Sequence, residues 1–271
     1  MAAGEIEYFG NPSQIAVLKR GRALFDILES DERISCHGRV CGVVTPKHGS
    51  LALIGRLAHL QGASHYANVA SDEIEAVLAG ARALGLDTVD YARWEIHADQ
   101  FDHDRHSNAD PNLPDGITVT CLTPETPEPV IRSFAETSLA CGVLPAWRSA
   151  HTGQALRSRT LIAVTPDGQV VSSAYATSYI VGTSELASNE CFWGMLATHP
   201  DWRGKGLSVV LGSLLLEQMH KEFGFTRFYT GIEPGNTASE AVCSKIGLTI
   251  TSNRIVTVAD ASQLPGGRMT K

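Results

Sequence analysis

The segment 203–208, Arg-Gly-Lys-Gly-Leu-Ser, has the composition of an anion-binding turn. It follows the apolar run 190–198 and precedes a long amphipathic stretch, so we expect it to lead from a strand into a helix. Successive backbone N–H groups at the start of a helix bind phosphate groups with the help of the helix dipole. Glycine lets the anion approach because it has no Cβ atom. The pattern therefore predicts a phosphate or pyrophosphate site.

Two common phosphate motifs do not fit this segment. A dinucleotide-binding turn has a third glycine and an acid about twenty residues further on, at the end of the next strand. Here the third glycine is absent and Glu222 falls inside the expected helix. A P-loop would need Gly-Lys-Ser or Gly-Lys-Thr, which is also absent. The structural alternative is a tight turn in which the glycines serve geometry alone.

The segment resembles the main signature of the GNAT superfamily of acyl-CoA-dependent N-acyltransferases, Arg/Gln-x-x-Gly-x-Gly/Ala. Arg203 and Gly206 match that signature, whereas Ser208 departs from it but remains small. A second element at 236–248, NTASEAVCSKIGL, keeps the spacing of the family's Asn-x-x-Ala-x-x-x-Tyr-x-x-x-Gly-Phe with three departures. The resemblance covers roughly residues 116–258, where the expected order of elements is also that of the family.

The resemblance implies an N-acetyltransferase that uses acetyl-CoA as a co-substrate. The acetyl group would move to a primary amine of a small molecule or peptide, by direct attack in a ternary complex and without a metal. Backbone N–H groups of the strand at 195–198 would hold the oxyanion. The predicted cofactor-binding residues are Leu196, Ala197, Thr198, Arg203, Gly204, Lys205, Gly206, Leu207, Ser208 and Asn236.

Glu190 is the predicted base for the acceptor ammonium, whose pKa is near ~10 in water. It stands thirteen positions before Arg203, a distance at which some histone-acetyltransferase-like members carry a glutamate. Alternation along the strand gives Glu190 the same face as Phe192 and Leu196, where desolvation would raise its pKa. A solvated glutamate at the edge of a strand fits the sequence equally well.

Cys243 stands where the family often has a tyrosine that protonates the leaving thiolate. A thiol with a pKa near ~8.5 leaves tolerably as the thiolate, so turnover need not depend on this acid. Cys243 is thus a candidate proton donor, although a buried helix cysteine usually serves packing.

The rest of the sequence divides into parts 1–115 and 116–271, with the polar stretch 97–116 as a linker or long loop. The histidines and aspartates of that stretch are expected in a solvated loop, because they lack the local structure that fixes metal ligands. In the first part we expect helices at 12–30 and 71–85 and strands at 39–46, 50–57 and 87–96. In the second part we expect strands at 116–124, 190–198, 227–234 and 248–258, a hairpin at 159–180, and helices at 127–142, 145–156, 206–223 and 236–247. Ser71 and Thr237 are the expected helix caps.

The expected fold is α/β, a GNAT-like mixed and splayed sheet with flanking helices. A smaller α/β or α+β N-terminal domain would precede it. The order of elements in 1–115 resembles a shortened, degenerate copy of the same plan, and an unrelated α+β cap is the alternative.

The composition indicates a globular protein of 271 residues, 43% hydrophobic and 19% charged. No apolar run reaches the ~18 residues of a membrane span. The N-terminus has no signal-peptide pattern, and the six cysteines include no CxxC pair, so we expect reduced thiols and a cytoplasmic location. Residues 1–115 hold 17 acidic and 10 basic side chains and so account for the whole net charge of −7. This charge argues against nucleic acid as a partner.

Two other functions are compatible with the sequence. One is a non-catalytic acyl-CoA-binding or sensing protein, which the departures at Ser208 and Cys243 permit. The other is an acyl-carrier-linked synthase of the same fold.

Overall fold

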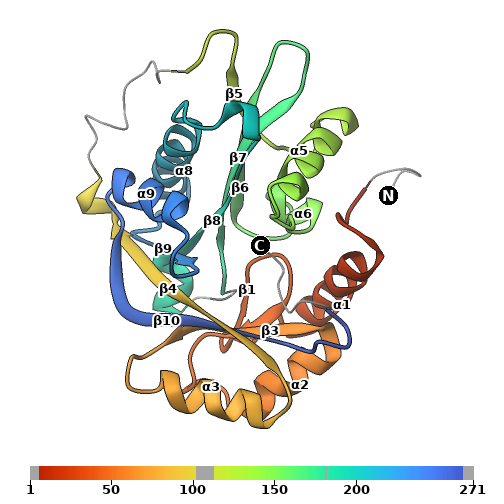
Figure 1. Ribbon diagram of the computed structural model, residues 1–271, viewed down its shortest axis with the longest axis vertical. Coiled ribbons are helices and arrows are strands. Elements are labelled where there is room, and N and C mark those ends of the chain that lie inside the picture. The colour runs from red at the N-terminus through yellow and green to blue at the C-terminus, as the bar shows by residue number, and fades with distance from the viewer. Residues whose placement is uncertain (1–5, 102–112, 181, 183, 265–271) are drawn as a thin grey trace.

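The structure is a computed structural model that describes residues 6–101, 113–180, 182 and 184–264. These residues form one large mixed sheet with flanking helices (Figure 1). The predicted α/β fold class is therefore confirmed. None of the helices in the described part of the chain has the length and apolar character that crossing a bilayer requires.

The N-terminal half begins with helix α1, which a capping box starts. The Asn11 side chain accepts a hydrogen bond from the backbone N–H of Gln14, and the Gln14 side chain accepts one from the backbone N–H of Asn11. The elements of this half are α1 (Pro12–Leu28), β1 (Ile34–Cys36), β2 (Cys41–Val43), α2 (Leu51–Gln61), β3 (Ala63–Val69), α3 (Ile74–Ala83), β4 (Asp87–His97) and the short η1 (Ala98–Gln100).

The C-terminal half contains the hairpin expected at 159–180, whose turn places Gly168 at a φ of 88°. The elements of this half are β5 (Thr118–Cys121), α5 (Glu128–Ala140), α6 (Arg148–His151), β6 (Ser158–Val164), β7 (Val170–Ser178), α7 (Glu185–Asn189), β8 (Glu190–Thr198), η2 (Pro200–Trp202), α8 (Leu207–Phe223), β9 (Arg227–Ile232), α9 (Thr237–Ile246) and β10 (Thr249–Ala259).

The two halves repeat one plan and exchange their last strands. β2-α2-β3-α3-β4 follows the same order as β8-α8-β9-α9-β10, and each set begins with a parallel pair of strands. β4 pairs with β9 of the other half, and β10 pairs with β3. The strand order is β1-β2-β3-β10-β4-β9-β8-β7-β6-β5. From the central pair β10 and β4, the strands β3, β2 and β1 on one side correspond in order to β9, β8 and β7 on the other. This symmetry supports a degenerate copy in the N-terminal half.

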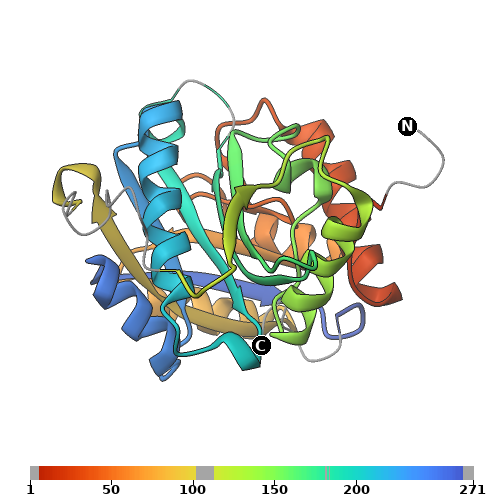
Figure 2. The same ribbon diagram turned by 90° about the horizontal axis from the view of Figure 1, so that it is seen from above.

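Alternating side chains of β6 let helices cover both faces of the sheet. Leu161 and Ala163 pack in one core cluster with Leu211 and Leu215 of α8. Ile162, between them, packs in another cluster with residues of α5. In Figure 1 and the perpendicular view of Figure 2, α8 and α5 accordingly lie on opposite sides of β6–β8.

The strand predicted at 50–57 is wrong, because this segment forms the first part of α2. Ser50 caps the helix by accepting a hydrogen bond from the backbone N–H of Leu53. Ile54, Leu57 and Ala58 are buried at helical spacing. A short apolar run has no periodicity that separates a strand from a buried helix, and here the cap decides the outcome.

Other local predictions also need correction. Helix α3 starts at Ile74 without a side-chain cap, so Ser71 is not the cap. Asn236, not Thr237, caps α9. The helix predicted at 145–156 is the four-residue α6, after which the chain turns. Strands β1 and β3 were not predicted, and residues 102–112 of the predicted linker lie outside the described residues.

Candidate active site

Strands β8 and β9 run parallel and part after their first residues. Glu190–Phe192 pair with Arg227–Tyr229, and no described residue further along continues this ladder. On its other side, β8 shifts register against β7 between Ser173 and Tyr175. Met195 lies in this irregularity with a φ of 51°, the only positive φ among the described non-glycine residues. Such a bulge bends a strand and turns its backbone groups out of the ladder.

The parting strands enclose a cleft of about 210 Å³. The first wall, which we call the β8–β9 wall, consists of residues 192–196 and 230–233 with Asn236, Ser239 and Cys243 of α9. A second wall, called here the N-terminal wall, consists of His37, Arg39, Val40, His65 and Tyr91. Val143, Ile255 and Thr257 complete the lining. The cleft is thus built by both halves of the chain.

The loop 203–208 has an open backbone at the start of α8. Gly204 and Gly206 have φ values of 74° and 79°, which residues with a Cβ rarely adopt. A Cβ placed on either glycine would have no described atom within 4 Å, so this side of the loop is unobstructed. Gly206 is the N-cap residue and has no side chain with which to cap the helix. The first-turn N–H groups of α8 therefore lack the side-chain acceptor that caps most helices, and they suit an external anion.

Side chains of the signature hold this loop against β8. The Nε of Arg203 donates to the carbonyl oxygen of Thr198 over 3.2 Å. The hydroxyls of Thr198 and Ser208 lie 2.8 Å apart, as do those of Ser172 and Thr198. Ser208, the departure from the family signature, thus ties the first turn of α8 to the sheet. The ammonium of Lys205 lies 4.2 Å from the centre of the Trp202 ring.

The sequence-predicted site residues divide between loop and cleft. Leu196, Asn236 and Cys243 line the cleft, whereas Ala197 is 2% exposed and is not among the lining residues. Burial raises the pKa of the Cys243 thiol to about 12. At neutral pH this thiol is protonated, but it is a weaker acid than a leaving thiol with a pKa near ~8.5.

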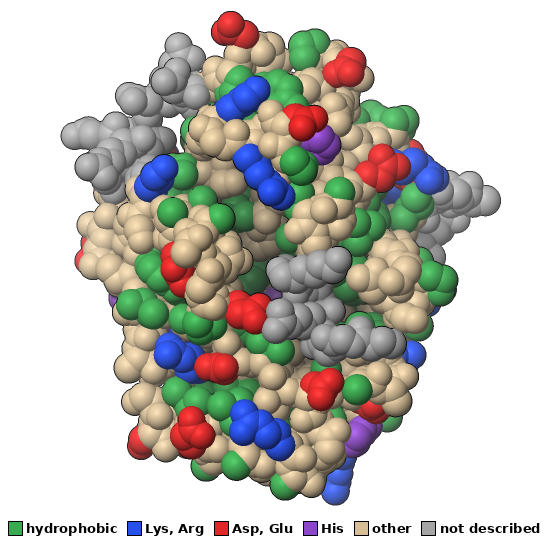
Figure 3. Space-filling model, in the orientation of Figure 1, with side chains coloured by type: hydrophobic (Ala, Val, Ile, Leu, Met, Phe, Trp, Pro, Cys, Tyr) green, Lys and Arg blue, Asp and Glu red, His purple; other side chains and the backbone are tan. Residues whose placement is uncertain are grey.

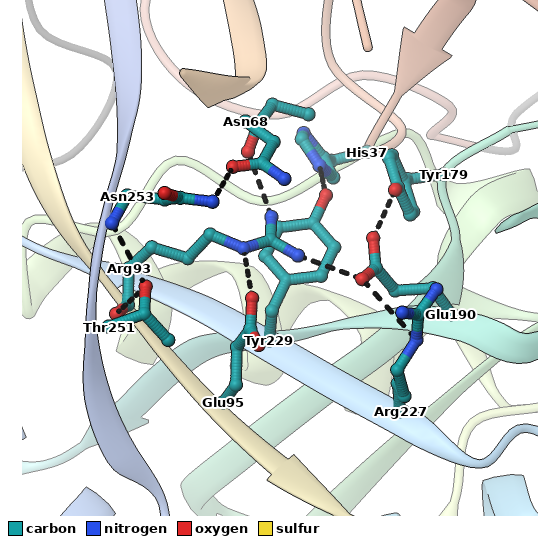
Figure 4. Close-up of polar contacts among 11 residues, drawn as sticks. His37, Asn68, Arg93, Glu95, Tyr179, Glu190, Arg227, Tyr229, Thr251 and Asn253 are labelled. Atoms are coloured by element: carbon teal, nitrogen blue, oxygen red, sulfur yellow. Dashed lines mark hydrogen bonds and ion pairs between the residues drawn. The ribbon is translucent and has the colours of Figure 1, made fainter. Parts of the chain in front are cut away.

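Glu190 is not among the described lining residues of the cleft. Its carboxylate points toward Arg93 and Tyr179 (Figure 4). Its carboxylate is 2.9 Å from the Nη2 of Arg93, and the hydroxyl of Tyr179 donates to the other oxygen. Arg93 is completely buried and Glu190 is 5% exposed. The carboxylate is therefore neither the solvated edge residue nor the isolated buried acid that the sequence allowed; it is half of a buried ion pair.

Sequence reasoning missed the side chains that connect this ion pair to the cleft. The guanidinium of Arg93 lies 3.7 Å from the centre of the Tyr229 ring, and the Tyr229 hydroxyl is 2.7 Å from the Nε2 of His37. The His37 ring packs against Phe192 and His65 of the cleft lining. No motif in segment 34–43 indicated His37, and only the packing of the two halves brings it to Tyr229.

Burial fixes the charge states of this network. Desolvation, together with the neighbouring His65, Arg39 and Arg93, lowers the pKa of His37 well below its usual 6.5. Desolvation also lowers the pKa of His65 to about 4. It raises the pKa of Tyr229 well above 10. At neutral pH the imidazoles are therefore uncharged and the phenol is protonated.

No described residues form a cluster of three or more histidine, cysteine, aspartate or glutamate side chains able to hold a metal ion. The candidate ligands of the segment 102–112 lie outside the described residues. Acidic and basic side chains are interspersed over the face seen in Figure 3, without a basic stripe.

One family model matches part of this chain, and solved structures resemble it over larger shares. Residues 134–248 match the family model described as the acetyltransferase (GNAT) family. No curated protein matches the sequence.

Solved structures share the fold at low identity. A GCN5-related N-acetyltransferase from Kribbella flavida is 14% identical, with a TM-score of 0.55 over 93% of this chain and 96% of that one. One from Sphaerobacter thermophilus is 17% identical, with a TM-score of 0.51 over 85% and 76%. A tandem GNAT protein from the clavulanic acid biosynthesis pathway, solved without acetyl-CoA, is 16% identical, with a TM-score of 0.52 over 77% and 68%.

Proposed function

Residues 134–248 belong to the acetyltransferase (GNAT) family, and from this premise we propose that the protein transfers an acetyl group from acetyl-CoA to a primary amine. The reaction is a direct attack of the amine on the thioester while both substrates are bound. The observation that carries the proposal is that one strand, β8, both lines the cleft and is followed by the helix α8, whose start has no side-chain cap. An anionic cofactor with a long, narrow arm fits such a site.

The loop 203–208 binds the pyrophosphate of the coenzyme in this proposal. Its support is the open glycine backbone, the dipole of the seventeen-residue α8, and the guanidinium of Arg203. The pantetheine arm then follows the β8–β9 wall past Asn236 and Leu196. Backbone N–H groups near the bulge at Met195 stabilise the oxyanion, because the bulge frees them from the ladder.

His37 takes the proton of the acceptor amine, directly or through one water. It is an uncharged imidazole in the lining of the cleft, and the tautomer that donates Nε2–H to the Tyr229 oxygen leaves the Nδ1 lone pair available. Glu190, the base expected from the sequence, is the second candidate. Its carboxylate is bound by Arg93 and Tyr179, neither of which is among the described lining residues of the cleft, so a base role for Glu190 requires a proton relay through further groups.

The coenzyme leaves as a thiolate, with or without a proton from Cys243. The raised pKa of Cys243 makes that transfer uphill. The neighbouring helix start at α9, capped by Asn236, contributes a positive dipole end.

Acetyl-CoA incubated with the protein and a pool of primary amines tests the proposal. We expect release of free coenzyme thiol that depends on the amines, and N-acetylated products in the mass spectrum. Calorimetry with acetyl-CoA alone separates binding from turnover. Binding of acetyl-CoA without any amine-dependent thiol release would contradict the transfer reaction and favour a non-catalytic acyl-CoA-binding protein. A preference for acyl groups on a carrier protein would favour the synthase.

A further inference from the structure

Two cysteines face each other where the turn that carries His37 begins and ends. Cys36 is the last residue of β1 and Cys41 the first of β2, and the two are direct partners in the antiparallel ladder. Cross-strand partners project their side chains from the same face of a sheet. Both cysteines are free thiols, and they are 2% and 0% exposed. The fold thus places two thiols side by side in its core.

The backbone hydrogen bonds show that this is the closer kind of cross-strand pair. The N–H of Cys36 donates to the carbonyl oxygen of Tyr179 over 2.7 Å. The N–H of Cys41 donates to the Oε1 of Gln61 over 2.9 Å. Neither N–H is directed at the opposite cysteine, so the pair is of the non-hydrogen-bonded type, in which the Cα atoms are ~4.5 Å apart. That separation lies within the ~4.4–6.8 Å that a disulfide bridges.

The two thiols interact with each other. A hydrogen bond with the Cys36 side chain, together with burial, raises the pKa of the Cys41 thiol. The Cys41 Sγ also lies 3.8 Å from the carbonyl oxygen of Gly21 in α1. A thiol with a raised pKa exchanges slowly, because the thiolate is the reacting form. The pair therefore withstands a brief contact with an oxidant and responds to lasting oxidation.

The position of β1 in the sheet gives an oxidant access to this pair. β1 is three residues long and is the outermost strand beside β2. Short peripheral elements open locally at a lower free energy than the central strands of a sheet. Once one thiol has reacted with an oxidant, the second is already held next to it, and this proximity favours a bond within the protein.

The turn 37–40 between the two cysteines is closely packed. Three of its four residues line the cleft. A Cβ at Gly38 would lie 2.8 Å from the Cβ of Ala146. A Cβ at Gly21 would lie 2.0 Å from the carbonyl oxygen of Arg39. Because the turn is packed on both of these sides, drawing the two sulfur atoms from contact to a bond length of ~2.05 Å displaces it.

We propose that Cys36 and Cys41 form a redox switch, in which a disulfide between them displaces His37 and slows acetyl transfer. The inference rests on the proposed function, because it uses His37 as the base. A small disulfide such as oxidised glutathione is the oxidant. One cysteine thiolate attacks a sulfur of oxidised glutathione and releases one glutathione, and the second thiolate attacks the mixed disulfide and releases the other. The two thiol protons end on the two reduced glutathione molecules.

Equilibration with oxidised glutathione tests the chemistry on the wild-type protein. The folded protein is incubated for hours at millimolar oxidant, remaining thiols are alkylated, and tryptic peptides are analysed by mass spectrometry. Trypsin cuts after Arg39, so the disulfide would link the peptides 34–39 and 40–47. We expect more than half of the protein to carry this link. Alkylation or glutathione adducts at Cys36 and Cys41 in place of the link would overturn the proposal.

Activity measures the consequence for the proposed function. Oxidation should lower kcat/KM for an accepted amine at least tenfold, because a misplacement of about 1 Å can cost ~10² in rate. Reduction with dithiothreitol should restore it, and the affinity for acetyl-CoA should not change. An unchanged kcat/KM in the linked protein would overturn the switch while leaving the transferase intact.

Matched variants separate this pair from the other thiols. Cys36→Ala and Cys41→Ala should abolish both the link and the effect of the oxidant on kcat/KM. Cys121→Ala removes a thiol on β5 and should keep both. Melting curves check that each variant folds, and the link and its reversal are measured on the wild-type protein in any case. An effect of the oxidant that persists in Cys36→Ala would assign it to another cysteine and overturn the switch.

If no amine is acetylated, the proposed transfer fails, and NMR of the wild-type protein still decides the inference. The imidazole resonances of His37, assigned by comparison with His37→Gln, should shift when the link forms and return on reduction. Unshifted resonances in the linked protein would overturn the displacement of His37.

Discussion

The two halves of the molecule use the same strand–helix–strand unit for different purposes. In the C-terminal half, α8 begins at Gly206, which leaves the helix start without a side-chain cap. In the N-terminal half, the hydroxyl of Ser50 caps α2, and Thr45 bonds His48 within the preceding loop. One helix start is thus satisfied by the protein itself, while the other remains suited to an anion. A repeated scaffold needs only a local change of sequence to gain or lose such a site.

The two units also differ in whether their parallel strands stay close together. β8 and β9 separate after three residue pairs, and the cleft lies between them. β2 and β3 stay close, since a Cβ at Gly42 would lie 2.3 Å from the carbonyl oxygen of His65. The backbone N–H of Asn68 also donates to the carbonyl of Val44 over 2.9 Å, just past the paired residues. In the N-terminal unit the parallel strands stay close together, and the unit contributes one wall of the cleft. In the C-terminal unit the parallel strands separate, and the cleft lies between them.

The largest effect is expected where the halves meet, at the pair His37 and Tyr229. His37→Gln should lower kcat/KM by ~10²–10⁴ because it removes the base while keeping a hydrogen-bonding side chain. Glu190→Gln should cost less, since Glu190 is outside the lining of the cleft. A larger loss in Glu190→Gln that recovers as pH rises would assign the proton transfer to Glu190, as the sequence indicated.

The pH profile sharpens this assignment. The pKa of His37 lies well below 6.5 in the folded protein, so the imidazole remains neutral and able to accept a proton as pH falls through 6.5. The acidic decline of kcat/KM should therefore begin below pH 6.5. A decline centred at the usual histidine pKa or above would contradict a role for this buried imidazole.

Charge reversal in the two equivalent loops should affect acetyl-CoA binding only in the C-terminal half. Arg203→Glu should weaken acetyl-CoA binding at least tenfold, about 1.4 kcal/mol, because it places a like charge beside the diphosphate. Lys47→Glu makes the same change in the closed N-terminal loop and should leave the affinity unchanged. Calorimetry on both variants, with melting curves as a folding control, measures the difference. Equal acetyl-CoA affinities of the two variants would contradict the assignment of the pyrophosphate site to loop 203–208.

A smaller effect is expected at Cys243. Cys243→Ala should keep kcat within about tenfold of the wild type, because general-acid contributions of ~10²–10⁴ require a better acid than this buried thiol. Steady-state kinetics at saturating acetyl-CoA measures it. A greater loss in a variant that melts normally would show that the thiol does take part.

The smallest effect concerns the cap of the closed unit. Ser50→Ala should lower the free energy of unfolding by about 1 kcal/mol through loss of the helix cap. Acetyl-CoA affinity should not change, because this helix start binds no cofactor in our proposal. Denaturant unfolding and calorimetry on the same variant measure the two quantities. A changed affinity would show that the N-terminal unit also contacts the coenzyme.

Much of the C-terminal half could be predicted because its signals are local. The glycines of loop 203–208 adopt the positive φ that only glycine tolerates well, and α8 follows within one residue of its expected start. Gly247 ends α9, as its position indicated, whereas the helix start is capped by Asn236 and not by the expected Thr237. The prediction for segment 50–57 was wrong because its apolar run suits either a strand or a helix, and the Ser50 cap together with burial on one helical face favours the helix.

The sequence by itself determined the α/β class, the helix start that suits an anion, and the resemblance of residues 134–248 to the acetyltransferase (GNAT) family. These features depend on neighbours within a few residues, so composition and spacing reveal them. Only the tertiary structure decided which side chains meet at the cleft. His37 and Tyr229 are 192 residues apart in the chain, and the exchange of β4 and β10 locks the two halves into one sheet. Such contacts follow from strand pairing between distant segments, for which a single sequence carries no local signal.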